Sequence, residues 1–498
     1  MKKWDRSRKK GKSNELVIAT AIGSMLLPFK AQTVLVDQIR FQSCMDAPPA
    51  SNHENLDPDD WDLELRQFHR ALDMALERQR HIREQVVWTA PPILQESPIP
   101  ATGTSLQHLV DRFQNEILPY ATGNTHPMFF GWVHGSGNIY GALGEALAAV
   151  MNCNVGGRNH VGRSLEKQVV GWFRDFFGFP KGATGILTSG TSMGTIIALT
   201  CARNSRAKWD VQRDGIRGGN VSMTAYASVA AHSCITKAFD LLGLGRNALR
   251  LIPVDANFRM DVDQLETAIR SDRENGFLPI CVISTVGSAN TGSIDEVASV
   301  ADIAAREGLW HHIDGAFGAF SICLPRYRHL ASAVALADSL AFDMHKWLHV
   351  PYDAGCVLVR DGGVHRQAFS LRPEYLQSLD DGIAGGEPWF CDYGPELSRA
   401  FRALKVWFTI QALGFDALRR AIAANCAQAA QLAEEINRQQ RLELLAPVTL
   451  NIVCLRIRPE RITDEPEINR LNRRVVSILH NRGLAVPSIT ELSGKIAI

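Results

Sequence analysis

The residue with the clearest chemical potential is Lys346, which lies in the stretch DSLAFDMHKWLHVPYDAG, directly after an alternating apolar run. Keeping an ammonium group among apolar neighbours is costly unless the amine is paired or neutralised. A lysine amine in such a setting can be nucleophilic near neutral pH and can form an imine with a carbonyl. A solvated lysine at a strand end is the structural alternative, and the residues alone favour neither.

Asp314 ends a second apolar run, in LWHHIDGAF. A buried carboxylate requires a cationic or hydrogen-bonding partner. A protonated pyridine nitrogen would be such a partner, as in enzymes that use pyridoxal phosphate, and the small Gly315 and Ala316 would let a flat ring approach. A helix N-cap is the simpler alternative for this aspartate.

Two further motifs could complete a cofactor site. In TSGTSMG, Thr191 and Ser192 offer hydroxyls and amides at the start of a predicted helix, an arrangement that binds phosphate but also serves as an ordinary cap. In SVAAHSCITKA, His232 could stack on a planar ring, or could be a structural histidine before a helix.

The elements that must position these residues follow from the hydrophobic pattern. Short apolar runs at 279–287, 309–314, 338–343 and 356–361 predict strands, and they alternate with helical patterns such as 164–179, 192–205 and 297–308. This alternation predicts an α/β fold with a mostly parallel sheet flanked by helices. Ligands bind at the carboxyl ends of such strands, where Asp314 and Lys346 stand.

The predicted organisation has four parts: a leader at 1–56, a helical segment at 57–125, a large domain at 126–400 and a small α/β domain at 401–498. The leader is basic and then apolar but has no signal-peptide cleavage site, so we expect a disordered leader with Met45 as an internal start, with export as the alternative. An apolar strand is still running at Ile498, so we expect an incomplete small domain, an uncovered edge and a less stable chain.

Composition restricts the partners and the compartment. The 53 basic and 52 acidic side chains give a net charge of +1, which provides no electrostatic reason to expect nucleic acid or a membrane surface. The ten cysteines are scattered singly without a C-x-x-C pair, which argues against a metal site and suits a cytoplasmic protein.

Several motifs together resemble the pyridoxal-phosphate-dependent group II decarboxylases, the family of aromatic-L-amino-acid, histidine and glutamate decarboxylases. The resemblance runs from about Asp57 to Ile498 and includes DMHKWLHVPYDAG, LWHHIDGAF, HPMFFGW, AAHSCITKA, STVGSANTGSID and FRALKVWF. It implies a type I PLP-dependent transferase-like fold and a homodimer with the site at the interface.

The resemblance also implies residue roles. Lys346 is similar to the lysine that binds the cofactor aldehyde, Asp314 to the partner of the pyridine nitrogen, and His232 to the residue stacked on the ring. The expected cofactor-binding set is Lys346, Asp314, His232, Thr191, Ser192, Ala316, His345 and Ser288. Tyr375 in LRPEYLQ matches a mobile-loop tyrosine that helps to protonate the substrate carbon, and it joins Lys346, His232 and Asp314 as a catalytic residue.

Two positions depart from the family pattern within the site. Asp343 and Met344 precede His345 where many relatives have Asn-Pro, and a carboxylate near a phosphate is repulsive unless it is oriented elsewhere. Ser288-Ala289 stands where a Thr-Thr pair is common, which removes one hydroxyl near the cofactor.

The expected function is decarboxylation of an L-amino acid to its amine and carbon dioxide. Phe129, Phe130 and Trp132 in one loop favour an aromatic substrate, although aromatic residues also pack cores. Acidic, diamino or histidine substrates, another pyridoxal phosphate lyase or aminotransferase, and a catalytically inactive structural or interaction homologue remain as alternatives.

Overall fold

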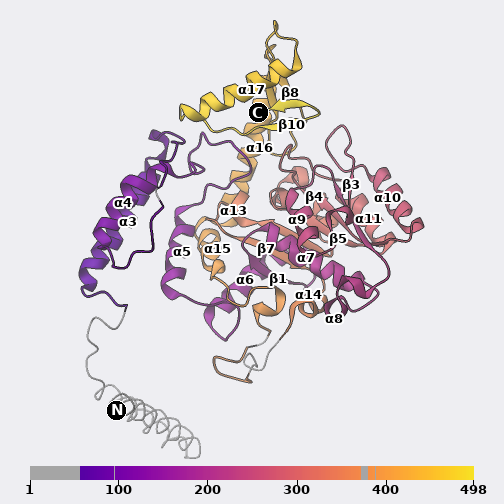
Figure 1. Cartoon of the computed structure of the whole chain (residues 1–498), viewed down its shortest axis with the longest axis horizontal. Coiled ribbons are helices and arrows are strands. Elements are labelled where there is room, and N and C mark those ends of the chain that lie inside the picture. The colour runs from indigo at the N-terminus through magenta and orange to yellow at the C-terminus, as the bar shows by residue number, and fades with distance from the viewer. Residues whose placement is uncertain (1–55, 95, 372–378, 387) are drawn as a thin grey trace, which may run out of the picture. The chain divides into compact units, whose positions relative to one another are not determined.

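The computed structural model describes residues 56–94, 96–371, 379–386 and 388–498 (Figure 1). The described residues form two compact units, one comprising 56–73 with Thr102–Asp111, and the other comprising the described residues of Met74–Ala101 and Arg112–Ile498. The predicted leader lies outside the described residues except for Leu56.

The segment at 57–125 contains α3 (Trp61–Arg80), which has acidic residues in its first turn and basic residues in its last turn. This charge pattern complements the helix dipole. In the first unit Arg70 lies 2.8 Å from Asp111 of α4 (Leu106–Arg112). α3 has no buried residue, and its apolar side chains, among them Trp61, Phe68 and Leu72, are exposed.

The second unit is built on a seven-stranded sheet with the order β1-β7-β6-β5-β4-β2-β3. The strands are β1 (Thr184–Thr188), β2 (Met223–Ser228), β3 (Leu249–Ile252), β4 (Leu278–Thr285), β5 (Trp310–Asp314), β6 (Ser339–Asp343) and β7 (Gly355–Val359). Only β7 is antiparallel to its neighbours in this sheet; the other pairings are parallel. The predicted α/β class with a mostly parallel sheet is therefore confirmed.

The sheet has helices on both faces (Figure 1). Alternate residues of β4 belong to different buried clusters: Cys281 and Ile283 pack with residues of α7 (Thr191–Arg206) and α9 (Ser233–Leu241), and Val282 packs with α10 (Val262–Glu274) and α11 (Val297–Glu307). This alternation follows from the two-residue period of a strand. Two faces buried in this way make the sheet a rigid support for the loops at its ends.

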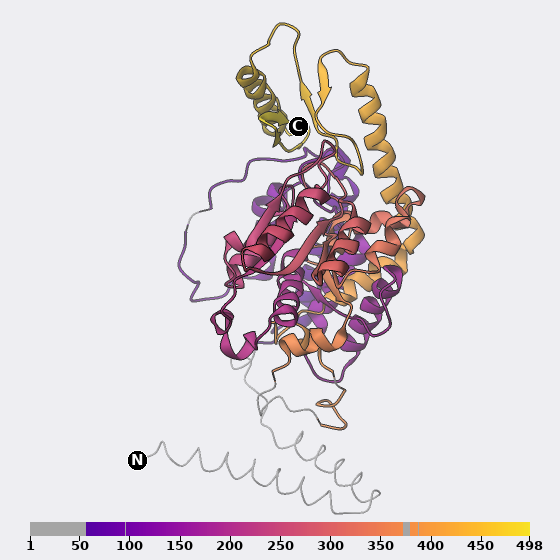
Figure 2. The same ribbon diagram turned by 90° about the vertical axis from the view of Figure 1, so that its right-hand side faces the viewer.

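Helices α5 (Ile139–Met151), α6 (Val161–Phe176), α12 (Leu330–Val334) and α14 (Gly362–Phe369) complete the surroundings of the sheet. α15 (Arg402–Leu413) packs on α5 and α6, and the long α16 (Phe415–Asn437) leads from it to the C-terminal segment (Figure 2). That segment contains β8 (Leu442–Leu444), β9 (Leu455–Ile457), α17 (Glu465–Asn481), β10 (Thr490–Leu492) and β11 (Lys495–Ala497). Its last residue, Ile498, exchanges backbone hydrogen bonds with Leu455.

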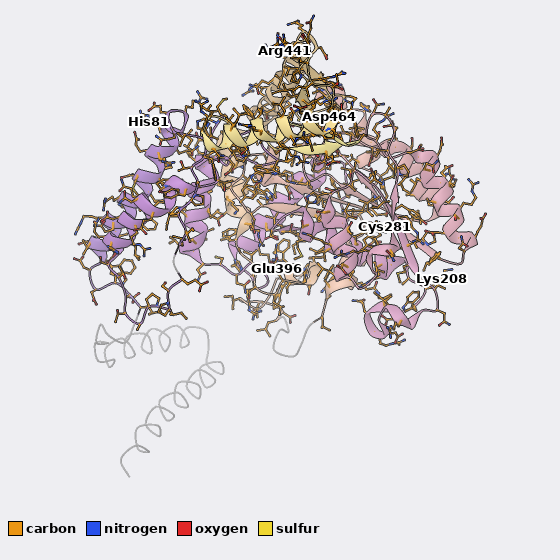
Figure 3. All side chains as sticks on the ribbon, turned by 45° about the horizontal axis from the view of Figure 1, so that its top comes forward. His81, Lys208, Cys281, Glu396, Arg441 and Asp464 are labelled. Carbon is orange, nitrogen blue, oxygen red and sulfur yellow. The ribbon has the colours of Figure 1, made fainter. Side chains whose placement is uncertain are left out.

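Eight cysteines in the described part of the chain are free thiols, namely Cys153, Cys201, Cys234, Cys281, Cys323, Cys356, Cys426 and Cys454. Cys281 lies fully buried within the sheet (Figure 3). Across the residues with assigned structure, no helix is both long and apolar enough to cross a membrane. No cluster of three or more histidine, cysteine or acidic side chains in these ranges could hold a metal ion.

Candidate active site

The carboxyl ends of the parallel strands carry the residues that the sequence singled out. Thr191 follows β1, His232 follows β2, Ser288 follows β4, Asp314 ends β5 and Lys346 follows β6. Because these strands run in the same direction, their carboxyl ends lie along one edge of the sheet, where α/β proteins bind ligands.

Lys346 and Asp314 come from neighbouring strands. β5 and β6 pair in parallel with Asp314 opposite Ala341, and the single-turn helix α13 (Met344–Trp347) begins directly after β6. Lys346 is also close enough to affect Asp314 electrostatically, because its positive charge opposes the rise in the pKa of Asp314. The two side chains therefore lie close together at this edge of the sheet.

Asp314 is a buried carboxylate with few local partners. Its Oδ1 accepts the Ala316 amide at 3.1 Å. Burial raises the pKa of Asp314, while the Ala316 amide, Lys346 and His232 act in the opposite direction. A cation placed against this carboxylate would offset the desolvation penalty, which is the role expected of a pyridinium nitrogen.

The amine of Lys346 lies 3.2 Å from Oδ2 of Asp343, and the lysine side chain is 22% exposed, so the amine remains reachable from solvent. His345 is held by its neighbours: its ring lies 4.4 Å from the Tyr352 ring, and its Nδ1 accepts the Ala354 amide at 3.1 Å. Burial lowers the pKa of His345.

The predicted phosphate turn forms the start of α7, with Gly190 at the N-cap and no side-chain cap from that residue. Gly190 lies close to the start of β7, because a Cβ on Gly355 would be 2.5 Å from the Gly190 Cα. The Thr191 hydroxyl is buried without a hydrogen-bond partner among the described residues, whereas Ser192 is exposed. A buried orphan hydroxyl beside helix amides fits an anionic group such as a phosphate.

His232 is the N-cap of α9, and its Nδ1 accepts the Cys234 amide at 3.2 Å. Its ring is exposed and close enough to Asp314 to influence the pKa of that carboxyl. The buried Cys234 thiol has its pKa raised to about 12 by burial and by Asp314, with a hydrogen bond from Ser192 acting in the opposite direction. These influences place His232, Ser192 and Asp314 in one neighbourhood.

Ser288 is not brought into this cluster through its hydroxyl. Its Oγ forms hydrogen bonds with Thr291 Oγ1 at 2.9 Å and Ser293 Oγ at 2.8 Å within its own buried turn. A role for Ser288 in binding the cofactor stays a prediction. Tyr375 lies outside the described residues, and its role likewise stays a prediction.

The aromatic loop contributes to a cavity of about 510 Å³. Phe129 and Trp132 line it, together with Trp88 and with Arg473 and His480 of α17. Lys346, Asp314 and His232 are not among its lining residues, and Phe130 is 61% exposed and does not line it either.

Two residues that the sequence analysis missed connect this cavity with the lysine. The His134 ring lies 5.7 Å from Phe129, 6.0 Å from Trp132 and 6.0 Å from Tyr352, and Tyr352 packs on His345. Burial lowers the pKa of His134, and Lys346 contributes in the same direction. An almost continuous series of rings therefore extends from the cavity towards Lys346.

The aromatic loop is anchored directly to the lysine loop. A Cβ on Gly135 would be 1.9 Å from the His345 carbonyl oxygen, so only glycine permits this approach. The Asn138 amide donates to the His349 carbonyl at 2.7 Å, and Ser136 Oγ lies 2.9 Å from His349 Nδ1. The glycines of WVHGSG were the one sequence signal that could have indicated this contact.

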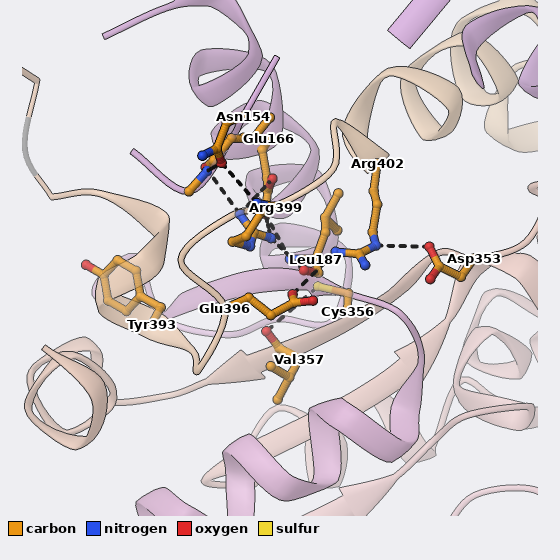
Figure 4. Close-up of polar contacts among 12 residues, drawn as sticks. Asn154, Glu166, Leu187, Asp353, Cys356, Val357, Tyr393, Glu396, Arg399 and Arg402 are labelled. Atoms are coloured by element: carbon orange, nitrogen blue, oxygen red, sulfur yellow. Dashed lines mark hydrogen bonds and ion pairs between the residues drawn. The ribbon is translucent and has the colours of Figure 1, made fainter. Parts of the chain in front are cut away.

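A buried ion pair supports the turn that precedes α7 (Figure 4). Arg399 Nη2 donates to Glu166 Oε1 and to the Leu187 carbonyl, both at 2.6 Å, and Glu166 accepts the Leu187 amide at 3.0 Å. Leu187 lies in β1, the edge strand that leads to Gly190. Nearby, Arg402 Nε donates to Asp353 at 2.9 Å, which fixes the residue after Tyr352. The two arginines thus hold both chain segments that border the site.

Comparison with known proteins agrees with this geometry. Residues 91–458 match the family model described as the pyridoxal-dependent decarboxylase conserved domain. The chain belongs to this family. It is therefore a carboxy-lyase that uses pyridoxal phosphate to decarboxylate an amino acid.

Individual relatives extend over most of the chain. It is 31% identical over 445 residues to an aromatic-L-amino-acid decarboxylase of Bacillus atrophaeus, covering 87% of this chain and 90% of that protein. It is 29% identical over 450 residues to tyrosine decarboxylase 4 of Petroselinum crispum, covering 86% and 87%. The Oryza sativa TDC structure with PLP and tryptamine is similar with a TM-score of 0.81 and 25% identity, covering 89% of this chain and 94% of that one.

Proposed function

We propose that this decarboxylase converts an aromatic L-amino acid into the corresponding amine and carbon dioxide at Lys346. The observation that carries the proposal is the placement of Lys346 and Asp314 at the ends of adjacent parallel strands, with an orphan Thr191 hydroxyl at the same edge. Lys346 would hold the cofactor aldehyde, Asp314 the pyridine nitrogen, and Thr191 and Ser192 the phosphate. His232 and Ala316 would lie against the ring, and His345 would border it.

When bound, pyridoxal phosphate supplies an electron sink for the pair of electrons that remains when the carboxylate leaves. The chain's own residues orient and protect this chemistry. Asp314, buried and close to Lys346, would stabilise positive charge at the ring nitrogen. Lys346 provides the amine that binds and releases the aldehyde. Tyr375 is proposed to deliver the proton to the α-carbon of the product.

The aromatic preference is supported by the rings beside the lysine. Phe129, Trp132, His134 and Tyr352 form successive contacts between the cavity and His345. Aromatic side chains stack favourably on such surfaces. The named activities of the Bacillus atrophaeus and Petroselinum crispum relatives point to the same substrate class.

A cytoplasmic homodimer is part of the proposal. Apolar residues along α5 are exposed in the single chain: Ile139 by 52%, Leu143 by 50%, Leu147 by 40% and Val150 by 76%. A contiguous apolar helix face of this kind is typical of a subunit interface. The free thiols of eight described cysteines suit a reducing compartment.

The test is to incubate the purified protein and pyridoxal phosphate with a panel of aromatic, acidic, basic and imidazole amino acids. We expect an amine and carbon dioxide from aromatic substrates. Formation of a keto acid instead would identify an aminotransferase, and an amine from an acidic or diamino substrate alone would disprove the aromatic assignment.

Lys346→Ala provides the control for the assigned lysine. This variant should lose the visible absorption of the bound cofactor and at least about 10³-fold of the activity, because no other amine takes its place. Retention of the absorption band would place the cofactor on another residue.

A further inference from the structure

Asp343 is the residue of the site that fits a phosphorylated cofactor least well. It is the last residue of β6, and its side chain is 4% exposed. Oδ1 accepts the Thr191 amide at 2.7 Å, and Oδ2 lies 3.2 Å from the Lys346 amine and 3.5 Å from His345 Nε2. One carboxylate therefore contacts the start of α7, the lysine and the neighbouring histidine.

The contact with Thr191 places negative charge where a phosphate would otherwise be favoured. The first amides of a helix attract anions because they lack intrahelical partners and because the helix dipole is positive there. Gly190 at the N-cap provides no side chain, so Asp343, which lies far away in sequence, supplies the acceptor for the first amide of α7. The Thr191 hydroxyl beside it has no partner within the described residues.

The contact with Lys346 gives the same carboxylate a second role. With both oxygens engaged, Asp343 holds the α7 start, His345 and the lysine amine in a fixed relative position. A neutral amide could keep the Thr191 contact but not the charge pairing with the lysine. The substitution Asp343→Asn can therefore separate the effect of the hydrogen bond to Thr191 from the effect of the negative charge.

We propose that Asp343 is a positioning residue that keeps the cofactor site assembled, and that its charge weakens the preference of the site for a phosphorylated aldehyde over an unphosphorylated one. This inference rests on the proposed assignment of Lys346 and Thr191 to the cofactor. The phosphate must share the positive end of α7 with a fixed carboxylate, and close like charges repel most strongly when both are withdrawn from water.

The experiment compares pyridoxal phosphate with pyridoxal in the cofactor-free full-length protein, using the visible imine absorption to measure each dissociation constant. Because pyridoxal has no phosphate, its affinity depends only on the lysine and on the residues around the ring. Asp343→Asn should increase the affinity for pyridoxal phosphate relative to that for pyridoxal about tenfold, because it relieves one short-range charge repulsion. Inorganic phosphate should also compete more effectively with pyridoxal phosphate in this variant.

Two further variants are needed: Asp343→Ala, which removes the hydrogen-bond acceptor as well as the charge, and Asp361→Asn, which is the matched control. Asp343→Ala leaves the buried Thr191 amide without its acceptor, so both aldehydes should bind more weakly while their affinity ratio still rises. Asp361 is an exposed N-cap that accepts the Gly363 and Val364 amides of α14 at 2.8 and 3.1 Å. Because asparagine caps a helix as well as aspartate, Asp361→Asn should leave the ratio unchanged.

The outcomes distinguish this inference from the proposed function. If Lys346→Ala abolishes the imine band while Asp343→Asn keeps the wild-type ratio within twofold, the role of the Asp343 charge is overturned and the lysine assignment stands. If Lys346→Ala retains the band, the assignment of the lysine fails, and the inference fails with it. Thermal melting confirms that each variant is folded before it is titrated.

Discussion

Single residues determine the chemistry of this site, and the sequence was most informative about the residues that occur in short motifs. Lys346 and Asp314 could be predicted because each follows an apolar strand, and their meeting follows from strand order. His134 and Tyr352 could not be predicted in the same way. Their contacts depend on Gly135 packing against the His345 backbone, a tertiary contact for which the glycines of WVHGSG give a signal but no partner.

His134 is the residue whose polarity is expected to affect substrate choice. His134→Phe keeps a ring between Trp132 and Tyr352 but removes the ring nitrogens. We expect kcat/KM for tyrosine relative to phenylalanine to fall about tenfold, because a phenylalanine ring cannot hydrogen-bond a substrate hydroxyl. Steady-state kinetics with both substrates measure the ratio.

Phe129→Ala, at a ring that lines the same cavity and lies 5.7 Å from the His134 ring, is the matched control for that substitution. It removes apolar surface without removing a hydrogen-bonding group, so kcat/KM should fall for both substrates together. An unchanged tyrosine-to-phenylalanine ratio in His134→Phe would mean that His134 does not contact the substrate ring.

At the scale of elements, short apolar runs that alternate with helical patterns predicted β4, β5, β6 and β7 close to their actual bounds. β1 and β2 were not predicted, because TGILT contains a glycine and MTAYAS is rich in small residues, so neither shows a clear strand pattern. Their burial on the sheet overrides that weak local preference. The sequence therefore indicated the centre of the sheet better than its outer strands.

The pair of Arg399 and Glu166 is expected to be a major source of local stability. Arg399→Met leaves the fully buried Glu166 carboxylate without its cation, and should destabilise the chain by about 3–5 kcal/mol. Denaturant unfolding of the cofactor-free protein measures this free energy. The double variant Glu166→Gln with Arg399→Met should recover part of the loss, and a double variant as unstable as the sum of the two single ones would contradict the pairing.

His365 couples α14 to β1 in a pH-dependent way. Its ring bonds Thr184 Oγ1 at 2.9 Å and the Tyr393 carbonyl at 2.8 Å, and burial lowers its pKa to about 4. The unfolded chain, with a histidine pKa near 6.5, binds this proton more readily than the folded chain. Stability is therefore complete above about pH 6.5 and should fall by about 3 kcal/mol as the pH approaches 4.

His365→Gln retains a donor and an acceptor but cannot titrate, so thermal melts between pH 7 and pH 4.5 should show a shallower decline than in the wild type. The buried His311 and His312, whose pKa values are lowered to about 4 and 3, contribute to the decline that remains. If the melting temperatures of His365→Gln and wild type decline equally with falling pH, His365 does not contribute to the pH dependence of stability.

For the whole molecule, the resemblance of motifs indicated the fold and the reaction, and the family match confirmed both. The division into a leader and three further parts stays a prediction. α15, at the start of the predicted small domain, packs on α5 and α6 of the sheet unit. The assembly also stays a proposal, because a sequence does not show which apolar helix faces are covered by another chain.

The proposed dimer predicts an effect of charge on α5. Leu143→Asp with Leu147→Asp should convert the dimer to a monomer, because each carboxylate would be buried at the interface without a partner. Analytical ultracentrifugation measures the mass. Leu336→Asp, at a position 65% exposed after α12, is the control and should leave the mass unchanged. A double variant that keeps the wild-type mass would exclude α5 from the interface.

The antiparallel return of β7 beside β6 has a consequence for how this enzyme can diversify. Asp343 and Gly355 stand opposite each other in the ladder, so the intervening segment with the reactive amine is a short closed loop fixed at both ends. An insertion or deletion there would shift the amine relative to the start of α7. New substrate ranges should therefore arise through changes in the surrounding segments, while the length of this loop stays constant.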